Sequence, residues 1–97
     1  MARFVVLFDW TDQGVRSAKE SVQRVSQAKT AFKKDGVEIE SIYWTLGTHD
    51  LVGVLTAPDG ETLAAVLLRL GALGNVRTTT LRAFDEGEFR SILSKLG

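Results

Sequence analysis

Hydrophobic residues follow two different spacings along the chain, and their order predicts alternating strands and helices. Residues 4–8 and 51–55 are hydrophobic at almost every position, which is typical of short strands that are buried on both faces. Residues 37–46 alternate in part, so that Ile39 and Tyr43 fall on one face while Ile42 and Trp44 fall on the other. Residues 75–84 are rich in threonine and predict a further strand. Four strands are therefore expected.

Two long stretches between the strands have hydrophobic residues three or four positions apart, as amphipathic helices do. These residues are Val15, Ala18, Val22, Val25, Ala28, Ala31 and Phe32 in the first stretch, and Leu63, Ala64, Val66, Leu67, Leu70 and Leu73 in the second. Serines and β-branched residues lower helix propensity around Ser21, which predicts a break there with Ser21 as an internal N-cap. Asp59 stands at the expected N-cap of the second helix.

A short helix is predicted at the C-terminal end of the sequence. Asp85 has the capping-box spacing to Glu88, which places the start of the helix just after Asp85. Its hydrophobic residues are expected to dock it on the rest of the chain, and they are Phe89, Ile92, Leu93 and Leu96.

The order strand, helix, strand, strand, helix, strand predicts an α+β, ferredoxin-like βαββαβ sandwich with a four-stranded antiparallel sheet, followed by the C-terminal helix. Both crossover helices of such a fold cover the same face of the sheet. The strands at 4–8 and 51–55 are nevertheless hydrophobic on both faces, and exposed apolar surface of that extent marks an interface. The sequence therefore predicts a homo-oligomer in which the open sheet face packs against a second subunit.

Length and composition narrow the classes of protein to which the chain can belong. The 97 residues have the size of one domain, which is expected to span 1–97. Twelve basic residues balance twelve acidic ones, so nucleic acid and anionic membranes are not predicted partners. No hydrophobic run approaches the roughly 20 residues of a membrane span, and the first run is too short for a signal peptide, which predicts a cytoplasmic location.

The chain has no cysteine, which excludes disulfides, thiolate metal ligands and cysteine nucleophiles. His49 is its one histidine, so no histidine-based metal site is expected within a single chain, and no cofactor is predicted.

Three separated motifs give the chain a resemblance to the small bacterial GYD-domain family over essentially its whole length. They are residues 10–14 (WTDQG), 43–47 (YWTLG) and 73–84 (LGNVRTTTLRAF). In the name-giving Gly-Tyr-Asp element, Gly47 and Asp50 match, and His49 stands where the tyrosine is expected. The resemblance implies the dimeric α/β-barrel type of fold and no particular reaction. Effector domains of leucine-responsive regulators and small cofactor-free monooxygenases are similar in layout, but one fold hosts many functions.

The predicted hairpin between 43 and 55 contains most of the residues that are candidates for catalysis or ligand binding. His49 is able to act as acid, base or axial ligand, although an exposed turn histidine is the more common situation. Asp50 suits a turn cap or an ion pair with arginine. Tyr43 and Trp44 suit either a pocket for a planar ligand or an anchor in a core or interface.

Two further groups of charged residues are candidates for chemistry. Treated as a parallel neighbouring pair, the first and third strands place Asp9 and Asp50 at opposite ends of the sheet, too far apart for a carboxylate pair of the kind glycosidases hold within about 5–10 Å. Arg77 suits an anionic ligand or an intersubunit ion pair. The predicted ligand-binding residues are thus Tyr43, Trp44, His49, Asp50 and Arg77, with no catalytic residue assigned.

Three functions remain open from the sequence. The first is a homo-oligomeric module that binds or senses a small molecule. The second is a cofactor-free monooxygenase or isomerase of the dimeric α/β-barrel type. The third is a structural assembly subunit.

Overall fold

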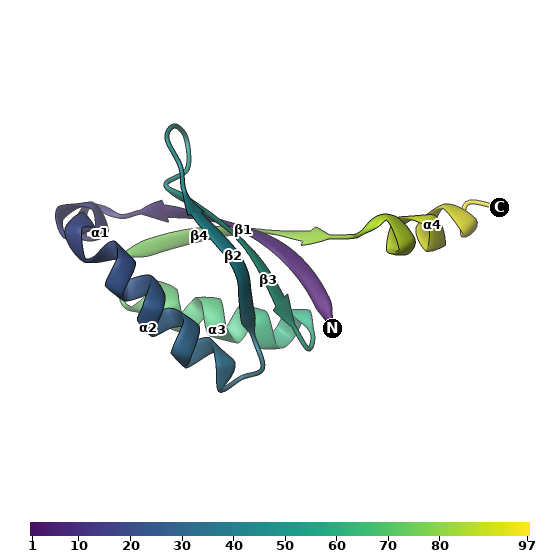
Figure 1. Ribbon diagram of the computed structural model, residues 1–97, viewed down its shortest axis with the longest axis horizontal. Helices are drawn as coiled ribbons and strands as arrows, with labels where there is room; N and C mark the ends of the chain where they lie inside the picture. The colour runs from purple at the N-terminus through teal and green to yellow at the C-terminus, as the bar shows by residue number, and fades with distance from the viewer.

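The computed structural model describes residues 1–97 as a four-stranded antiparallel sheet with two long helices on one face (Figure 1). In chain order the elements are β1 (Ala2–Trp10), α1 (Asp12–Arg16), the 3-10 helix η1 (Ala18–Glu20), α2 (Ser21–Lys33), β2 (Glu38–Trp44), β3 (Leu51–Ala57), α3 (Gly60–Ala72), β4 (Val76–Ala83) and α4 (Glu86–Ser94). The sheet order is β2-β3-β1-β4. This confirms the predicted ferredoxin-like topology. None of the helices combines the length and the hydrophobicity that crossing a bilayer requires.

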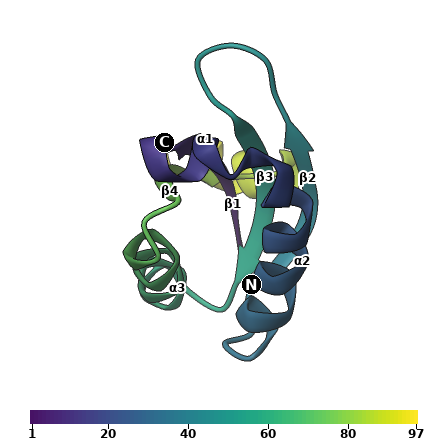
Figure 2. The same cartoon turned by 90° about the vertical axis from the view of Figure 1, so that its left-hand side faces the viewer.

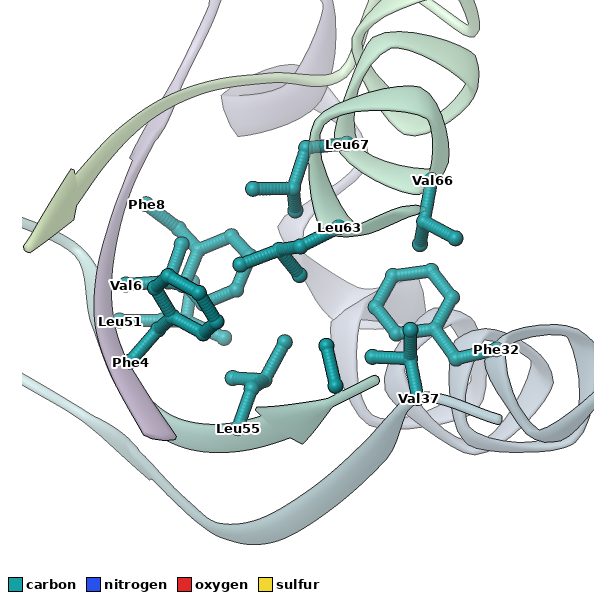
Figure 3. Close-up of a cluster of buried hydrophobic side chains, with 11 residues drawn as sticks. Phe4, Val6, Phe8, Phe32, Val37, Leu51, Leu55, Leu63, Val66 and Leu67 are labelled. Atoms are coloured by element: carbon teal, nitrogen blue, oxygen red, sulfur yellow. The ribbon is translucent and has the colours of Figure 1, made fainter. Parts of the chain in front are cut away.

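The core lies between the sheet and the helices α2 and α3. It is built from alternate residues of β1 and β3, which present Phe4, Val6, Phe8, Leu51 and Leu55 to the helices. Figure 3 shows that Leu63 and Leu67 point from α3 toward the rings of β1, whereas Phe32 lies between Val66 and Val37. The opposite alternation leaves Val5, Leu7, Val52 and Val54 on the face that no helix covers.

The first helical segment breaks at the position predicted from the sequence. Thr11 caps α1 by accepting a hydrogen bond from the Gly14 N–H at 3.1 Å, and α2 begins only at Ser21. Ser21 does not act as an N-cap, because its hydroxyl is buried and accepts the Trp44 indole N–H at 2.9 Å. Val15 of α1 and Val22 of α2, which both belong to the predicted hydrophobic stripe, are exposed.

The loop that precedes β4 packs tightly against α1. The Thr11 N–H donates to the Asn75 carbonyl at 3.1 Å, and the Gln13 side chain donates to the Leu73 carbonyl at 3.0 Å. Gly14 is buried here, and a Cβ at this position would lie 2.0 Å from the Asn75 carbonyl oxygen. Only a residue without a side chain fits between the two backbones.

A bulge in β2 corrects the faces predicted for this strand. Ile39 pairs with Leu55 and Ser41 pairs with Val54, so Glu40 is an extra residue that has no partner in the ladder. The extra residue resets the alternation. Ile39 therefore joins Ile42 and Trp44 on the helix side, whereas the predicted strict alternation placed Ile39 on the face of Tyr43.

Asp59 and Asp85 cap the later helices as predicted. The Asp59 carboxylate accepts the Thr62 N–H at 2.7 Å, and this hydrogen bond holds the pKa of Asp59 below the ordinary value for an aspartate. Asp85 and Glu88 form the complete capping box at the start of α4.

The predicted docking of α4 is wrong within the chain. β4 continues straight into α4, which extends beyond the sheet and away from α2 and α3 (Figure 1). Phe89 and Leu93 are 50% and 49% exposed as a result, and Leu96 is exposed as well. Arg82 contacts the segment between β4 and α4, since its guanidinium lies 4.5 Å from the centroid of the Phe84 ring.

Candidate functional site

A cavity of about 510 Å³ lies between α2, α3 and the helix-facing side of the sheet. Figure 2 shows the two helices standing apart on the same side of the sheet. Phe8, Ile42 and Leu51 line the cavity from the strands, and Phe32 and Val66 line it from the helices. Of the 19 lining residues, 13 are hydrophobic. Both the size and the apolar lining are typical of binding sites for small molecules, because such pockets have volumes of about 300–1,000 Å³.

Arg24 is a charged residue in the lining of this cavity. Its Nη1 donates to the Ser17 hydroxyl at 2.7 Å, and its Nη2 donates to the carbonyls of Gly14 and Ser17 at 3.2 and 3.1 Å. None of these acceptors is charged, and Arg24 takes part in none of the ion pairs of the chain. Arg24 thus has no carboxylate within ion-pair distance at the cavity.

The other charged residues of the lining neutralise each other. Arg69 of α3 donates to the Asp35 carboxylate at 2.7 Å, and this ion pair joins α3 to the turn that follows α2. Asp35 and Arg24 lie near opposite ends of α2, so the cavity has an ion pair toward one end and a lone cation toward the other. Its net formal charge is therefore positive.

The second group of polar side chains lies where the β2–β3 hairpin meets the end of β1. The His49 Nδ1 and the Asp9 Oδ1 are 2.9 Å apart, and both side chains are about one third exposed. The Asp50 carboxylate accepts the Trp10 N–H at 2.8 Å, while the Asp50 N–H donates to the Phe8 carbonyl at 2.9 Å. Asp50 therefore completes the hydrogen bonding at the end of β1.

This arrangement corrects the prediction that Asp9 and Asp50 lie at opposite ends of the sheet. β1 and β3 run antiparallel with Phe8 opposite Leu51, so the end of one strand meets the start of the other. Asp9 is the hydrogen-bonding partner of His49, which the sequence did not reveal. No group of three or more histidine or acidic side chains is arranged to hold a metal ion.

The predicted ligand-binding residues divide between the two faces of the sheet. Arg77 lies opposite Asp9 in the β1–β4 register, on the open face, and Tyr43 lies opposite Val52 on the same face and is 65% exposed. Trp44 points to the helix side, where it donates to Ser21. None of the five predicted residues lines the cavity between α2 and α3, whereas Arg77 lines a second cavity of about 520 Å³ between α3 and β4. The role of the five residues in ligand binding stays a prediction.

Sequence reasoning missed Arg24 as a candidate site residue. The signal was its spacing, since Arg24, Ala28 and Phe32 are four residues apart and share one face of α2. An arginine in line with inward-facing residues indicates a charge that is directed toward the interior rather than toward solvent.

The profile of the GYD domain family matches residues 4–93. The chain belongs to the GYD domain family. A Thermus thermophilus protein named glutamine synthetase and cystathionine beta-lyase binding protein is 34% identical over 84 residues, which cover 86% of this chain and 88% of that protein. The crystal structure of TTHA0845 from Thermus thermophilus is similar with a TM-score of 0.56 and 26% identity, over 88% of this GYD chain and 95% of that chain.

Two further solved structures share the fold of this GYD domain. MtbAldR is similar with a TM-score of 0.69 and 15% identity, over 88% of this chain and 52% of that chain. The leucine response regulatory protein LrpA of Mycobacterium tuberculosis is similar with a TM-score of 0.58 and 19% identity, over 87% of this chain and 51% of that chain. The domain thus aligns with about half of each of these two chains, and the likeness is one of fold.

Proposed function

We propose that this GYD domain is a cytosolic, homo-oligomeric binding module that takes a small, largely apolar molecule into the cavity between α2, α3 and the sheet. The observation that carries the proposal is the cavity itself, because a core of this size normally closes over its apolar residues with few voids. Here Phe32, Val66 and Leu70 face an open space of about 510 Å³. Filling that space with apolar ligand atoms removes their surface from water at about 25 cal/mol per Å².

The proposed self-association uses the open sheet face. Val5, Leu7, Val52 and Val54 form a continuous apolar area on the two central strands, and each remains partly exposed in the single chain. A second copy supplies a matching apolar face, so burial of both is favourable. Because the cavity lies on the other side of the sheet, association and ligand binding are expected to be separable.

Ligand binding is tested with the neutral fluorophore N-phenylnaphthylamine, whose emission rises in apolar surroundings. We expect saturable binding that Ala28→Phe weakens at least tenfold, because the new ring fills the cavity. Ala65→Phe is the matched control, since Ala65 is an exposed helix residue outside the cavity, and it should leave binding unchanged. Equal binding by both variants would place the fluorophore elsewhere and remove the basis of the proposal.

Self-association is tested by light scattering after gel filtration at micromolar concentration. We expect an oligomer that Val54→Glu converts to monomer, because a carboxylate on the open face has no partner when it is buried. Val22→Glu is the control, because Val22 is exposed on α2 on the opposite side of the sheet. A monomeric unmodified protein would refute this part of the proposal.

A second candidate function is the binding of an enzyme, and the name of the Thermus relative favours it. The tip of the β2–β3 hairpin offers a contact, since Leu46 is fully exposed there and the tip projects away from the helices (Figure 1). We expect the purified domain to bind glutamine synthetase or cystathionine β-lyase from its own organism in gel filtration. Leu46→Asp should abolish the complex, and Val22→Asp should not. Absence of a complex with both enzymes would exclude this function.

A further inference from the structure

We propose that the cavity selects anionic apolar molecules, with Arg24 binding the anionic head group and the hydrophobic lining accommodating the tail. The class of ligand is a monocarboxylate with an aliphatic or aromatic body. This inference rests on the proposed binding function and specifies the ligand of the same cavity.

The first step of the argument concerns the charge. Arg24 lines a mostly hydrophobic cavity and is only partly exposed, yet every group that it binds is neutral. A guanidinium in such surroundings interacts more strongly with an anion than it does in water, because fewer water molecules screen it. An anionic ligand supplies the counter-charge that the chain itself does not provide.

The second step concerns the donors that remain. A guanidinium has five N–H donors, and the bonds to Gly14 and Ser17 use three of them. These bonds fix the guanidinium against the α1–η1 segment, so its position is set before a ligand arrives. One donor on Nε and one on Nη1 have no partner within the chain. Charge-assisted hydrogen bonds from such donors to carboxylate oxygens are about twice as strong as neutral ones.

The third step concerns the opposite end of the cavity. Asp35 is the anionic residue of the lining, and it is already bound to Arg69 at 2.7 Å. It lies 11 positions beyond Arg24, which corresponds to roughly 16 Å along a helix of 1.5 Å rise per residue. A ligand with one charged end and an apolar body of several carbons therefore meets a cation at one end and avoids the carboxylate at the other.

The experiment compares three molecules with the same tail and different head groups, namely decanoate, decanol and decylammonium, all below their micelle concentrations. Each is titrated against the N-phenylnaphthylamine complex of the full chain. We expect decanoate to displace the fluorophore at a concentration at least tenfold lower than decanol, and decylammonium to be the weakest of the three.

Variants then assign the preference to a residue. Arg24→Gln should remove the advantage of decanoate and leave decanol unchanged, whereas Arg24→Lys should keep part of the advantage because it retains the charge. Arg16→Gln is the control, since Arg16 is exposed and lies outside the cavity. Equal weakening of decanoate and decanol by Arg24→Gln would mean that Arg24 only supports the fold, and would overturn the proposal.

The ligand series in the unmodified protein is decisive even where a variant fails to fold. Equal displacement by decanoate and decanol would overturn the anion preference and leave the proposed binding function intact. Saturable fluorophore binding that none of the three molecules displaces would overturn the preference as well. Failure of the fluorophore itself to bind would overturn the proposed function first.

Discussion

Replacing Gly14 with alanine sets two opposing effects against each other, and the structure decides between them. Gly14 lies inside α1, where alanine is favoured over glycine by about 1 kcal/mol through helix propensity alone. The new Cβ, however, would lie 2.0 Å from the Asn75 carbonyl oxygen and 2.9 Å from its carbonyl carbon. Ordinary C···O contacts begin near about 3.3 Å, so α1 and the loop must separate by about 1 Å.

That separation breaks the contacts which hold the loop before β4. The hydrogen bonds of Thr11 N–H to Asn75 and of Gln13 to Leu73 measure 3.1 and 3.0 Å, and an additional separation of about 1 Å takes both beyond hydrogen-bond range. Further bonds join Thr11 to Gly74 and Gln13 to Asn75. At about 1 kcal/mol net for each bond, the loss is about 2–4 kcal/mol and exceeds the gain in propensity.

We therefore expect Gly14→Ala to lower the free energy of unfolding by about 1–3 kcal/mol, which is a fall in Tm of roughly 5–20 °C for a domain of this size. Urea titration followed by tryptophan fluorescence measures the change. Gly71→Ala is the matched control, because Gly71 lies inside α3 and a Cβ added there would have no atom within 4 Å, and it should stabilise the protein by about 0.5–1 kcal/mol. A Gly14→Ala protein as stable as the unmodified one would refute the reasoning.

Three further predictions concern the polar contacts of the fold. Asp59→Ala should lower Tm at neutral pH. The difference in Tm from the unmodified protein should shrink as the pH falls through the lowered pKa of Asp59, because the unmodified protein then protonates this N-cap. A difference that is constant from about pH 7 to about pH 2 would mean that the charge of Asp59 does not stabilise the helix. Asp85→Ala should lower the stability of α4 by about 1 kcal/mol, because it removes the N-cap of a helix that does not pack on the sheet. Amide hydrogen exchange should become faster in residues 86–94 alone. Exchange at an unchanged rate would mean that other contacts hold the helix. Ser21→Ala should shift the fluorescence emission of Trp44 and lower the free energy of unfolding by about 1 kcal/mol, because it removes the acceptor of the indole N–H. Ser26→Ala, on the exposed face of α2, should do neither. Identical spectra for the two variants would rule out the hydrogen bond to Ser21.

The sequence predicted the elements of the fold because each of them has a strong local signal. The spacing of Leu63, Val66 and Leu67 defines the inner face of α3, and Asp59 marks its start. The break before α2 was also visible, since serine and β-branched residues weaken a helix wherever they occur.

Features that depend on one extra residue or on distant contacts could not be predicted in the same way. The bulge at Glu40 changes which face Ile39 occupies, and no local pattern marks it. The meeting of Asp9 with His49 depends on the direction of β1 relative to β3, and the two residues lie 40 positions apart in the chain. The cavity is the space left between α2 and α3, which depends on how far apart two separate helices stand rather than on any single stretch of sequence.

The sheet order also has a consequence for solubility. β2 and β4 form the two edges, and the outer backbone groups of each are free to pair with a strand of another molecule. The bulge at Glu40 interrupts one of these edges, and Arg77 and Arg82 flank the three threonines of the other. Charges and bulges at an edge discourage the stacking of strands into fibrils. Replacement of both arginines by valine would leave β4 uncharged and rich in β-branched residues. Such a protein should aggregate during refolding at concentrations where the unmodified chain stays in solution.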